Sequence, residues 1–392
     1  MARSKRGRRP PSAAADRDAA TVQAVNALLL EPRSPAILTR LRKIAAIRGL
    51  VTDALRARVW PLLLGVKVTA EDAAQYQALQ GSTHKDSAVV ACDIARSLWS
   101  FTDGWSDAER EVKRAALRHV LDAAVAGNKA GLFYYQGLHD IAAVLLFVCG
   151  ELPACRLLRA LAEGHLRDCT RPDLAAATET LRLLYPILEQ CDPELYRYLM
   201  SLHEPALEVP YFALSWYMTW FAHDVPSQHQ IARLFDLFLA SHPLMPLYLA
   251  AVAIKGNRRD ILACGDDGLA VYSVLKKMRF LQPGQPDADE LAREAAALYQ
   301  AIPPRWLARR CMIHLQQATA INAYLGEGRW VVPAEPRGNR SQFGQQVVSQ
   351  LQALFGQPRQ GAALAAVVTS LTGLAAVGAL LLAQMQTAQW DR

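Results

Sequence analysis

An acidic residue and an arginine lie three positions apart within residues 90–96, where Asp93 precedes Arg96. If this segment is helical, both side chains lie on the same side of it, because positions i and i+3 are neighbours on a helix surface. One interpretation is an exposed ion pair, which stabilises a helix by roughly a few tenths of a kcal/mol. The other is an arginine directed at a bound phosphate, with the carboxylate holding its surroundings.

A second candidate is the segment at residues 133–140, which reads Phe-Tyr-Tyr-Gln-Gly-Leu-His-Asp. Gly137 permits close backbone approach, and the apolar residues that follow it predict a helix. Gln136 then lies at the mouth of that helix, with an amide that can both donate and accept hydrogen bonds. The alternative interpretation is an ordinary loop glutamine.

His139 and Asp140 form a pair of a kind that ligates metals in some phosphohydrolases. A metal site needs further ligands at one locus, and the other eight histidines are scattered without ligand spacing, so we predict no metal site. The sequence also contains no GxxxxGK(S/T), GxGxxG, GxSxG or HExxH motif. Any catalysis is therefore expected to complete the active site of another protein.

The elements that position these residues are predicted to be helices. Apolar residues recur at helical spacing from about residue 21 to residue 325, Ala and Leu dominate, and Pro or Gly separates the segments. The clearest segments are 109–127, 138–150, 174–189, 211–224, 227–240 and 288–300. No repeat of fixed period is present, so we predict one all-α domain with more than a dozen helices.

Composition limits the setting of this domain. Hydrophobic residues make up 52% of the chain, enough for a sizeable core, and the net charge is only +7. The seven cysteines form no CxxC pair, which favours free thiols in a reducing compartment. Residues 1–20 are predicted to be a disordered basic arm that stays solvated or binds anionic lipid or nucleic acid. No apolar stretch directly follows the basic residues, so we expect no secretory signal.

The C-terminal part changes character. Residues 326–360 are rich in Gly, Pro, Gln and Arg and are predicted to be a linker. Residues 361–383 then run for 23 positions without a charge, long enough as a helix to cross a hydrocarbon core of about 30 Å. A buried helix packed on the domain is the alternative. We predict a tail anchor, with the domain in the cytosol by the positive-inside rule and residues 384–392 as a short lumenal tail.

Residues 48–65, RGLVTDALRARVWPLLLG, resemble the opening segment of TBC-domain Rab GTPase-activating proteins. The matching positions are Gly49, Leu50, Leu55, Arg56, Val59 and Trp60. From the residues alone we expect a helix that starts near Thr52 and Asp53 and packs one face into the core. In the family this segment is structural.

Two further stretches carry the resemblance. Residues 90–96 are similar to the family pattern Ile-x-x-Asp-x-x-Arg, and residues 134–137 to its Tyr-x-Gln-Gly motif, with Asp140 following. Residues 212–224 and 233–251 look like later helices of the family, including an Arg233-x-x-Asp236 element. The order of the motifs is that of the family, and the resemblance covers roughly residues 45–305.

The resemblance implies a function in which this chain supplies two groups in trans to a Rab GTPase. Arg96 is then the arginine finger, which neutralises charge on the phosphates, and Gln136 positions the attacking water. The implied supporting residues are Asp93, Tyr134, Tyr135, Gly137 and Asp140. The nucleotide and magnesium belong to the GTPase, so we expect no cofactor of the chain's own and no nucleic-acid partner.

A TBC domain joined to a C-terminal anchor resembles the endoplasmic-reticulum branch of the family, which acts at the ER-to-Golgi step of vesicle trafficking. Residues 242–252, HPLMPLYLAAV, add to that likeness. Many members continue Arg-Thr-Phe-Pro after the finger, whereas this chain reads Arg-Ser-Leu-Trp from Arg96. Two alternatives remain: a membrane-tethered Rab-binding scaffold without GTPase-activating activity, and a helical lipid-binding protein.

Overall fold

The computed structural model describes residues 13–98, 102, 104–127, 132–282, 285–304, 306–307 and 320. Every regular element in these ranges is a helix, which confirms the all-α prediction. The helices are α1 (Ala13–Leu30), α2 (Pro35–Arg48), α3 (Asp53–Leu63), α4 (Ala70–Leu79), α5 (Ser87–Ala95), α6 (Asp107–Ala126), α7 (Leu138–Cys149), α8 (Glu151–Glu163), α9 (Ala175–Arg182), α10 (Leu184–Cys191), α11 (Pro193–Ser201), α12 (Pro205–Glu208), η2 (Tyr211–Ala213), α13 (Leu214–Met218), α14 (Gln228–Ala240), α15 (Met245–Gly256), α16 (Arg258–Leu262), α17 (Gly268–Lys276) and α18 (Ala288–Ala301).

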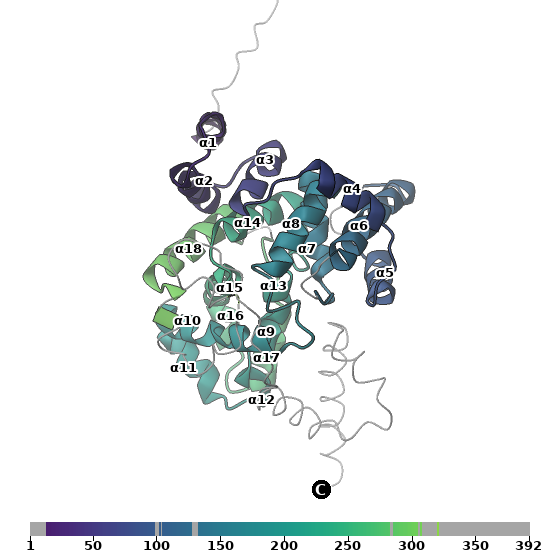
Figure 1. Ribbon diagram of the computed structural model, residues 1–392. Helices are drawn as coiled ribbons and strands as arrows, with labels where there is room; N and C mark the ends of the chain where they lie inside the picture. The colour runs from purple at the N-terminus through teal and green to yellow at the C-terminus, as the bar shows by residue number, and fades with distance from the viewer. Residues whose placement is uncertain are drawn as a thin grey trace, which may run out of the picture.

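The N-terminal helices α1 and α2 lie at one end of the molecule and α10 to α12 at the opposite end, with α5 and α6 along one side (Figure 1). Helix α15 packs against α10 and α18, while α7 packs against α3, α6 and α8. The core between them contains large, fully buried aromatic side chains, among them Trp60, Trp216, Trp220 and Tyr248. Burial of such rings, together with the aliphatic side chains around them, stabilises the domain.

Helix starts follow local capping chemistry. The hydroxyl of Thr52 accepts a hydrogen bond from the backbone N–H of Leu55, so α3 begins where the sequence predicted. Ser106 and Glu109 form a capping box at the start of α6. Helix α1 begins at Ala13, inside the arm predicted for residues 1–20, because its alanine-rich start has high helix propensity and Asp16 lies in its positively polarised first turn.

Two segments predicted as continuous helices are interrupted. Residues 174–189 divide at Leu183 into α9 and α10. Pro186 explains the division, because proline has no N–H to donate within a helix and is best tolerated in a first turn, where it lies in α10.

Residues 211–224 form only η2, α13 and a turn in which Trp220 and Phe221 both have positive φ, 52° and 63°. That conformation costs an L-residue about 1–2 kcal/mol. Burial of both rings offsets the cost: Trp220 packs edge-on to Phe235, and Phe221 packs edge-on to Phe280. The turn redirects the chain after α13 and determines where residues 222–224 lie.

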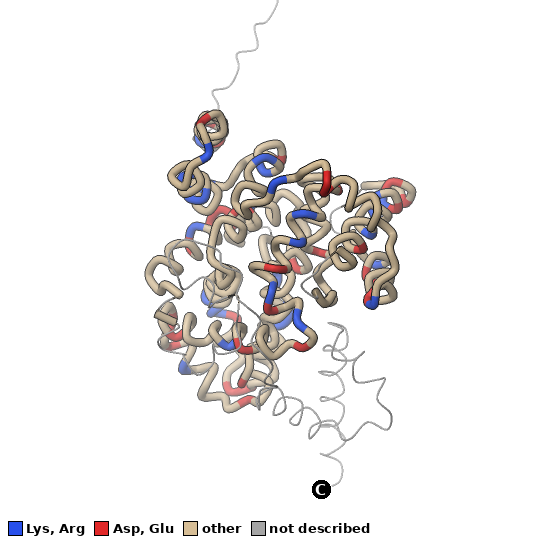
Figure 2. The backbone as a smooth tube through the Cα atoms, in the orientation of Figure 1, with Lys and Arg blue, Asp and Glu red and all other residues tan. Residues whose placement is uncertain are grey.

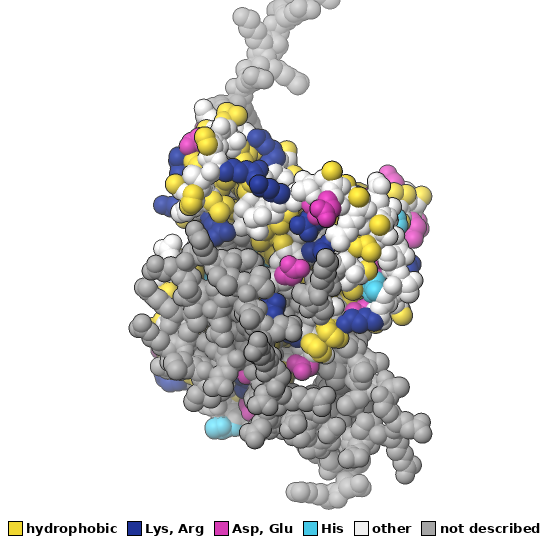
Figure 3. Space-filling view, viewed as in Figure 1, with side chains coloured by type: hydrophobic (Ala, Val, Ile, Leu, Met, Phe, Trp, Pro, Cys, Tyr) yellow, Lys and Arg dark blue, Asp and Glu magenta, His cyan; other side chains and the backbone are white. Residues whose placement is uncertain are grey.

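Charged residues of both signs are interspersed over the outer turns of the helices (Figure 2). On the face shown in Figure 3, Lys and Arg side chains gather over α1 to α3 beside apolar ones. Exposed residues of this region include Leu30, Arg33, Arg40, Lys43 and Arg58. The cysteines of the described ranges are free thiols.

No helix of the described ranges combines the length and apolar character needed to cross a bilayer. The predicted linker 326–360, membrane span 361–383 and tail 384–392 lie outside those ranges.

Candidate functional site

Arg96 lies at the C-terminus of α5, as the residue immediately after the last helical turn. A cation is favourable there because it faces the negative end of the helix dipole. The side chain is 47% exposed, and its Nη2 donates a hydrogen bond of 2.5 Å to Oδ1 of Asp93. The guanidinium is therefore both tethered and accessible.

The contact between Asp93 and Arg96 is not the exposed ion pair that one interpretation of the sequence predicted, because the side chain of Asp93 is only 1% exposed. Its Oδ2 accepts a hydrogen bond of 2.7 Å from the hydroxyl of Tyr134 and lies 3.4 Å from Nδ1 of His139. Burial alone would raise the pKa of this carboxyl group. The hydrogen bonds from its neighbours outweigh burial and hold the pKa of Asp93 below its ordinary value, so the group is a carboxylate.

The two tyrosines of the Tyr-Tyr-Gln-Gly segment fasten it to other helices. Tyr134 bonds Asp93 of α5 through its hydroxyl and Asp86 through its backbone N–H, at 3.1 Å. The hydroxyl of Tyr135 donates a bond of 2.8 Å to the carbonyl of Met218 at the end of α13. Both rings are buried, so the segment before α7 is held at both sides.

Gly137 is the residue before α7 and has φ of 107°, a conformation that glycine adopts without strain. It allows the chain to turn into the helix directly after Gln136. Gln136 as a whole residue is 8% exposed. The predicted position of this glutamine at the mouth of a helix is confirmed.

Asp140 lies in the first turn of α7 and extends the polar cluster. Its Oδ1 is 3.3 Å from Nε2 of His139, and its Oδ2 is 3.1 Å from Nδ1 of His223. The bond to Asp140 raises the pKa of His223 to about 9, although burial and the positive charge of Arg96 act in the opposite direction. His223 is thus a cation at neutral pH, within the electrostatic range of Arg96.

The structure therefore brings Asp93, Arg96, Tyr134, His139, Asp140 and His223 into one cluster, with Tyr135, Gln136 and Gly137 in the segment beside it. We call it the Asp93 cluster. Among the described residues, no group of three or more His, Cys, Asp or Glu side chains is arranged to hold a metal ion. His139, which the sequence raised as a metal ligand, instead has a carboxylate at each ring nitrogen.

Sequence reasoning did not single out His223. Its only signal was a second His-Asp pair, His223 and Asp224, at the end of an aromatic segment. The position of His223 next to Asp140 depends on the turn at Trp220 and Phe221, which helical periodicity does not reveal.

Described residues that follow Arg96 are held by two arginines of α6. Arg114 donates to the carbonyl of Ser97 at 3.2 Å. Arg110 donates to the hydroxyl and the carbonyl of Thr102, at 2.8 and 3.2 Å. This chain departs from the common family sequence directly after Arg96, where Leu98 adopts a positive φ of 69° and is buried.

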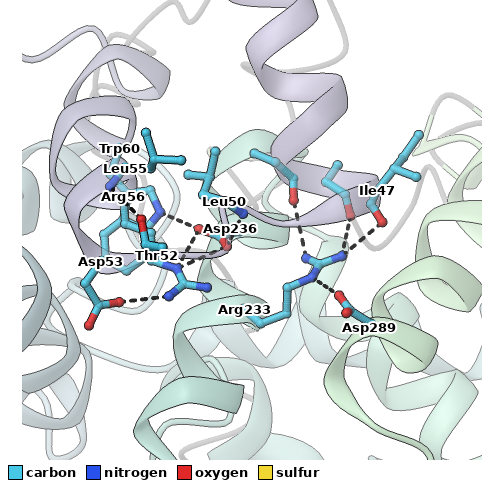
Figure 4. A network of polar contacts seen from close by, with 12 residues as sticks. Ile47, Leu50, Thr52, Asp53, Leu55, Arg56, Trp60, Arg233, Asp236 and Asp289 are labelled. Atoms are coloured by element: carbon cyan, nitrogen blue, oxygen red, sulfur yellow. Dashed lines mark hydrogen bonds and ion pairs between the residues drawn. The ribbon is translucent and has the colours of Figure 1, made fainter. Parts of the chain in front are cut away.

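The opening motif and the Arg233-x-x-Asp236 element meet elsewhere, as Figure 4 shows. Asp236 of α14 is fully buried and accepts bonds from the Arg56 guanidinium, the Trp60 indole at 2.8 Å and the Leu50 backbone N–H at 2.9 Å. Every oxygen of this carboxylate is satisfied by the segment 50–60. These residues join α14 to α3, in agreement with a structural role.

Arg233 joins α14 to α2 in a similar way. Its guanidinium donates to the carbonyls of residues 45–47, which the end of the helix leaves unpaired, and to the carboxylate of Asp289 in α18 (Figure 4). Gly49 lies against it with φ of 74°, and a Cβ there would come within 2.5 Å of Arg233 Cδ. Only glycine fits this position.

A family model described as "Rab-GTPase-TBC domain" matches residues 53–262, more than half of the chain. The chain belongs to this family. The resemblance seen in the three motifs is thereby confirmed, and the class is that of TBC-domain Rab GTPase-activating proteins, whose partners are Rab GTPases.

Similar TBC proteins are found in distant organisms. "TBC1 domain family member 20" of mouse is 36% identical over 276 residues, which cover 70% of this chain and 66% of the mouse protein. The human protein of that name is 34% identical over 292 residues, 74% and 70% of the two chains. The fission-yeast "GTPase-activating protein gyp10" is 31% identical over 258 residues, 65% and 66% of the two. The chain thus aligns with about two thirds of the length of these relatives.

The TBC fold is also recognised in three dimensions. The crystal structure of the Chlamydomonas flagellar RabGAP TBC domain is 17% identical and superposes with a TM-score of 0.51, covering 75% of this chain and 96% of the other. The helical arrangement is therefore shared at low sequence identity.

Proposed function

We propose that this chain accelerates GTP hydrolysis by a Rab GTPase, with Arg96 as an arginine finger and Gln136 as the residue that positions the water. The observation that carries the proposal is the Asp93 cluster. It fixes an accessible arginine at the end of α5, and through Tyr134 it ties the segment that contains Gln136 to the same buried carboxylate.

The chemistry requires a permanent, planar cation at the phosphates. Charge develops on the phosphate oxygens as the terminal phosphoryl group leaves, and an arginine supplied in trans stabilises it by a factor of about 10³–10⁵ in rate. Arg96 meets this need because Asp93 restricts its motion and 47% of its side chain stays accessible. The nucleotide and magnesium come with the GTPase.

The glutamine requires orientation more than charge. An amide can hold the attacking water through its oxygen and a phosphate oxygen through its nitrogen. Because Gln136 is largely buried beside Gly137, it has already lost most of its rotamer freedom, and little ordering entropy remains to be lost when the GTPase docks.

The decisive experiment is single-turnover GTP hydrolysis by a panel of Rab proteins, with and without the full chain. We expect stimulation of at least one Rab and a loss of about 10³-fold on Arg96→Ala. Arg118→Ala is the matched control, because Arg118 is 51% exposed and also pairs with a buried carboxylate, that of Asp122. Stimulation that survives Arg96→Ala contradicts the finger assignment. Rab binding without any stimulation favours the scaffold alternative.

We also propose that residues 361–383 anchor the chain in a membrane, with the TBC domain in the cytosol, and that its Rab acts at the ER-to-Golgi step. The uncharged run of 23 residues supports the anchor, and similarity to the TBC1 domain family member 20 proteins supports the branch of the family. Deletion of residues 361–392 should move the protein from the membrane to the soluble fraction of a cell lysate. Retention on membranes would contradict the anchor, and the lipid-binding alternative would then gain support.

A further inference from the structure

His139 is a buried imidazole in the Asp93 cluster to which the finger mechanism assigns no task. It lies in the first turn of α7, three residues after Gln136, and only 7% of its side chain is exposed. Its Nδ1 faces Asp93 at 3.4 Å and its Nε2 faces Asp140 at 3.3 Å. One ring thus connects the carboxylate that holds Arg96 to the carboxylate that holds His223.

The two oxygens of Asp93 have separate partners. Oδ1 accepts the hydrogen bond from Arg96. Oδ2 accepts the hydrogen bond from the Tyr134 hydroxyl and faces Nδ1 of His139. Rotation of the carboxylate would exchange these oxygens and move the guanidinium. Because Tyr134 and His139 both engage Oδ2, the plane of the carboxylate is set by groups other than the finger.

The hydrogen-bond partner of Nδ1 is the hydroxyl of Tyr134, at 3.2 Å. That hydroxyl donates its own proton to Oδ2 of Asp93, so its oxygen can accept a hydrogen bond from Nδ1. His139 therefore supports the same oxygen of Asp93 in two ways, directly across 3.4 Å and through Tyr134.

We propose that His139 is a positioning residue for the arginine finger, which holds the Asp93 carboxylate in the orientation that directs Arg96 toward the GTPase. The inference rests on the proposed function of Arg96. It attributes no contact with the GTPase or the nucleotide to His139.

Two amide substitutions test the two ring nitrogens of His139 one at a time. The nitrogen of an asparagine occupies nearly the place of Nδ1, and the nitrogen of a glutamine reaches nearly to the place of Nε2. His139→Asn therefore keeps a nitrogen toward Asp93 and Tyr134 and loses the one toward Asp140, whereas His139→Gln does the opposite. If His139 acts through Asp93, only His139→Gln should damage the finger.

The first readout is Rab-stimulated hydrolysis by the full chain, with kcat and KM determined separately. We expect His139→Gln to lower kcat about 10-fold with little change of KM, because a misdirected group loses transition-state stabilisation and not binding. His139→Asn should retain kcat within about 3-fold. In an Arg96→Ala background, His139→Gln should cause no further loss. Equal losses for the two variants, no loss for His139→Gln, or a further loss in the Arg96→Ala background overturns the proposal.

The second readout needs no GTPase. The Nε–H signal of Arg96 in the full chain, assigned by comparison with Arg96→Lys, reports the order of the guanidinium through NMR relaxation. We expect its order parameter to fall in His139→Gln and to stay unchanged in His139→Asn. An unchanged value in both overturns the proposal even if no Rab in the panel responds, whereas failure of the wild-type chain on every Rab overturns the proposed function instead.

His165→Gln is the control for stability. His165 is a buried histidine that is not a member of the Asp93 cluster; its Nε2 lies 3.2 Å from the Ser241 carbonyl, and its ring packs edge-on to Trp220. If His165→Gln lowers the melting temperature as much as His139→Gln does and kcat falls equally in both, the loss reflects stability and the proposal fails.

Discussion

At the scale of single residues, the Asp93 carboxylate is the centre of the candidate site. It is almost fully buried, accepts hydrogen bonds from Arg96 and Tyr134, and lies 3.4 Å from Nδ1 of His139. A buried charge is stable only while its partners surround it. The same groups that keep Asp93 ionised also hold Arg96, so the charge of Asp93 and the geometry of the proposed finger depend on one another.

Asp93→Asn tests this dependence. The amide keeps the size of the side chain but removes the negative charge opposite Arg96, and we expect kcat of the stimulated reaction to fall about 10-fold. Asp122→Asn is the matched control, since Asp122 is equally buried and is also paired with an arginine and a histidine, Arg118 and His84. The control should lose stability and keep kcat; equal losses of kcat in both variants would contradict the role of Asp93.

At the scale of elements, α14 joins the N-terminal helices to the rest of the domain through Arg233 and Asp236 (Figure 4). This junction tolerates no side chain at position 49, because the chain there has positive φ and lies against the Arg233 side chain.

Gly49→Ala should therefore lower the free energy of unfolding by about 3 kcal/mol, from backbone strain and a steric clash combined. Gly65→Ala isolates the strain, because Gly65 has φ of 67° and no atom of the described residues lies within 4 Å of the place that a Cβ would take there. We expect about 1 kcal/mol for that control. Chemical denaturation measures both; equal effects would show that contact with Arg233 does not matter.

Local patterns were sufficient for elements whose ends are set by local chemistry. Thr52 caps α3 and Gly137 precedes α7, as predicted. Both features depend only on residues that are close in the sequence: a hydroxyl that caps the first turn, and a glycine that adopts positive φ. Periodicity could not reveal the burial of Asp93, which depends on Tyr134 from a separate segment, or the place of His223, which depends on aromatic packing around Trp220.

At the scale of the whole molecule, the described part of the TBC domain buries two histidines in neutral form. Burial lowers the pKa of His165 to about 4 and that of His242 to about 3. Their ordinary pKa in the unfolded chain is about 6.5. Below that value the unfolded chain binds protons that the folded chain does not, so this contribution is present above pH 6.5 and is lost as the pH falls toward 4.

We therefore expect each of these histidines to lower the free energy of unfolding by about 2 kcal/mol between pH 7 and pH 5. His165→Gln should reduce this fall in the free energy of unfolding by about 2 kcal/mol, the contribution of one histidine. Denaturant titrations at the two pH values check this. An unchanged pH dependence in the variant would contradict the assignment of a neutral, buried His165.

The measurement that tests the central claim most directly compares the glutamine of this chain with that of the GTPase. Single-turnover hydrolysis is followed for a responsive Rab and for the same Rab with its own catalytic glutamine replaced by leucine, each with wild-type chain or Gln136→Ala. If Gln136 acts in trans, the wild-type chain stimulates both Rab proteins, and Gln136→Ala loses about 10²-fold or more on both. Full stimulation of the unaltered Rab by Gln136→Ala would contradict the account.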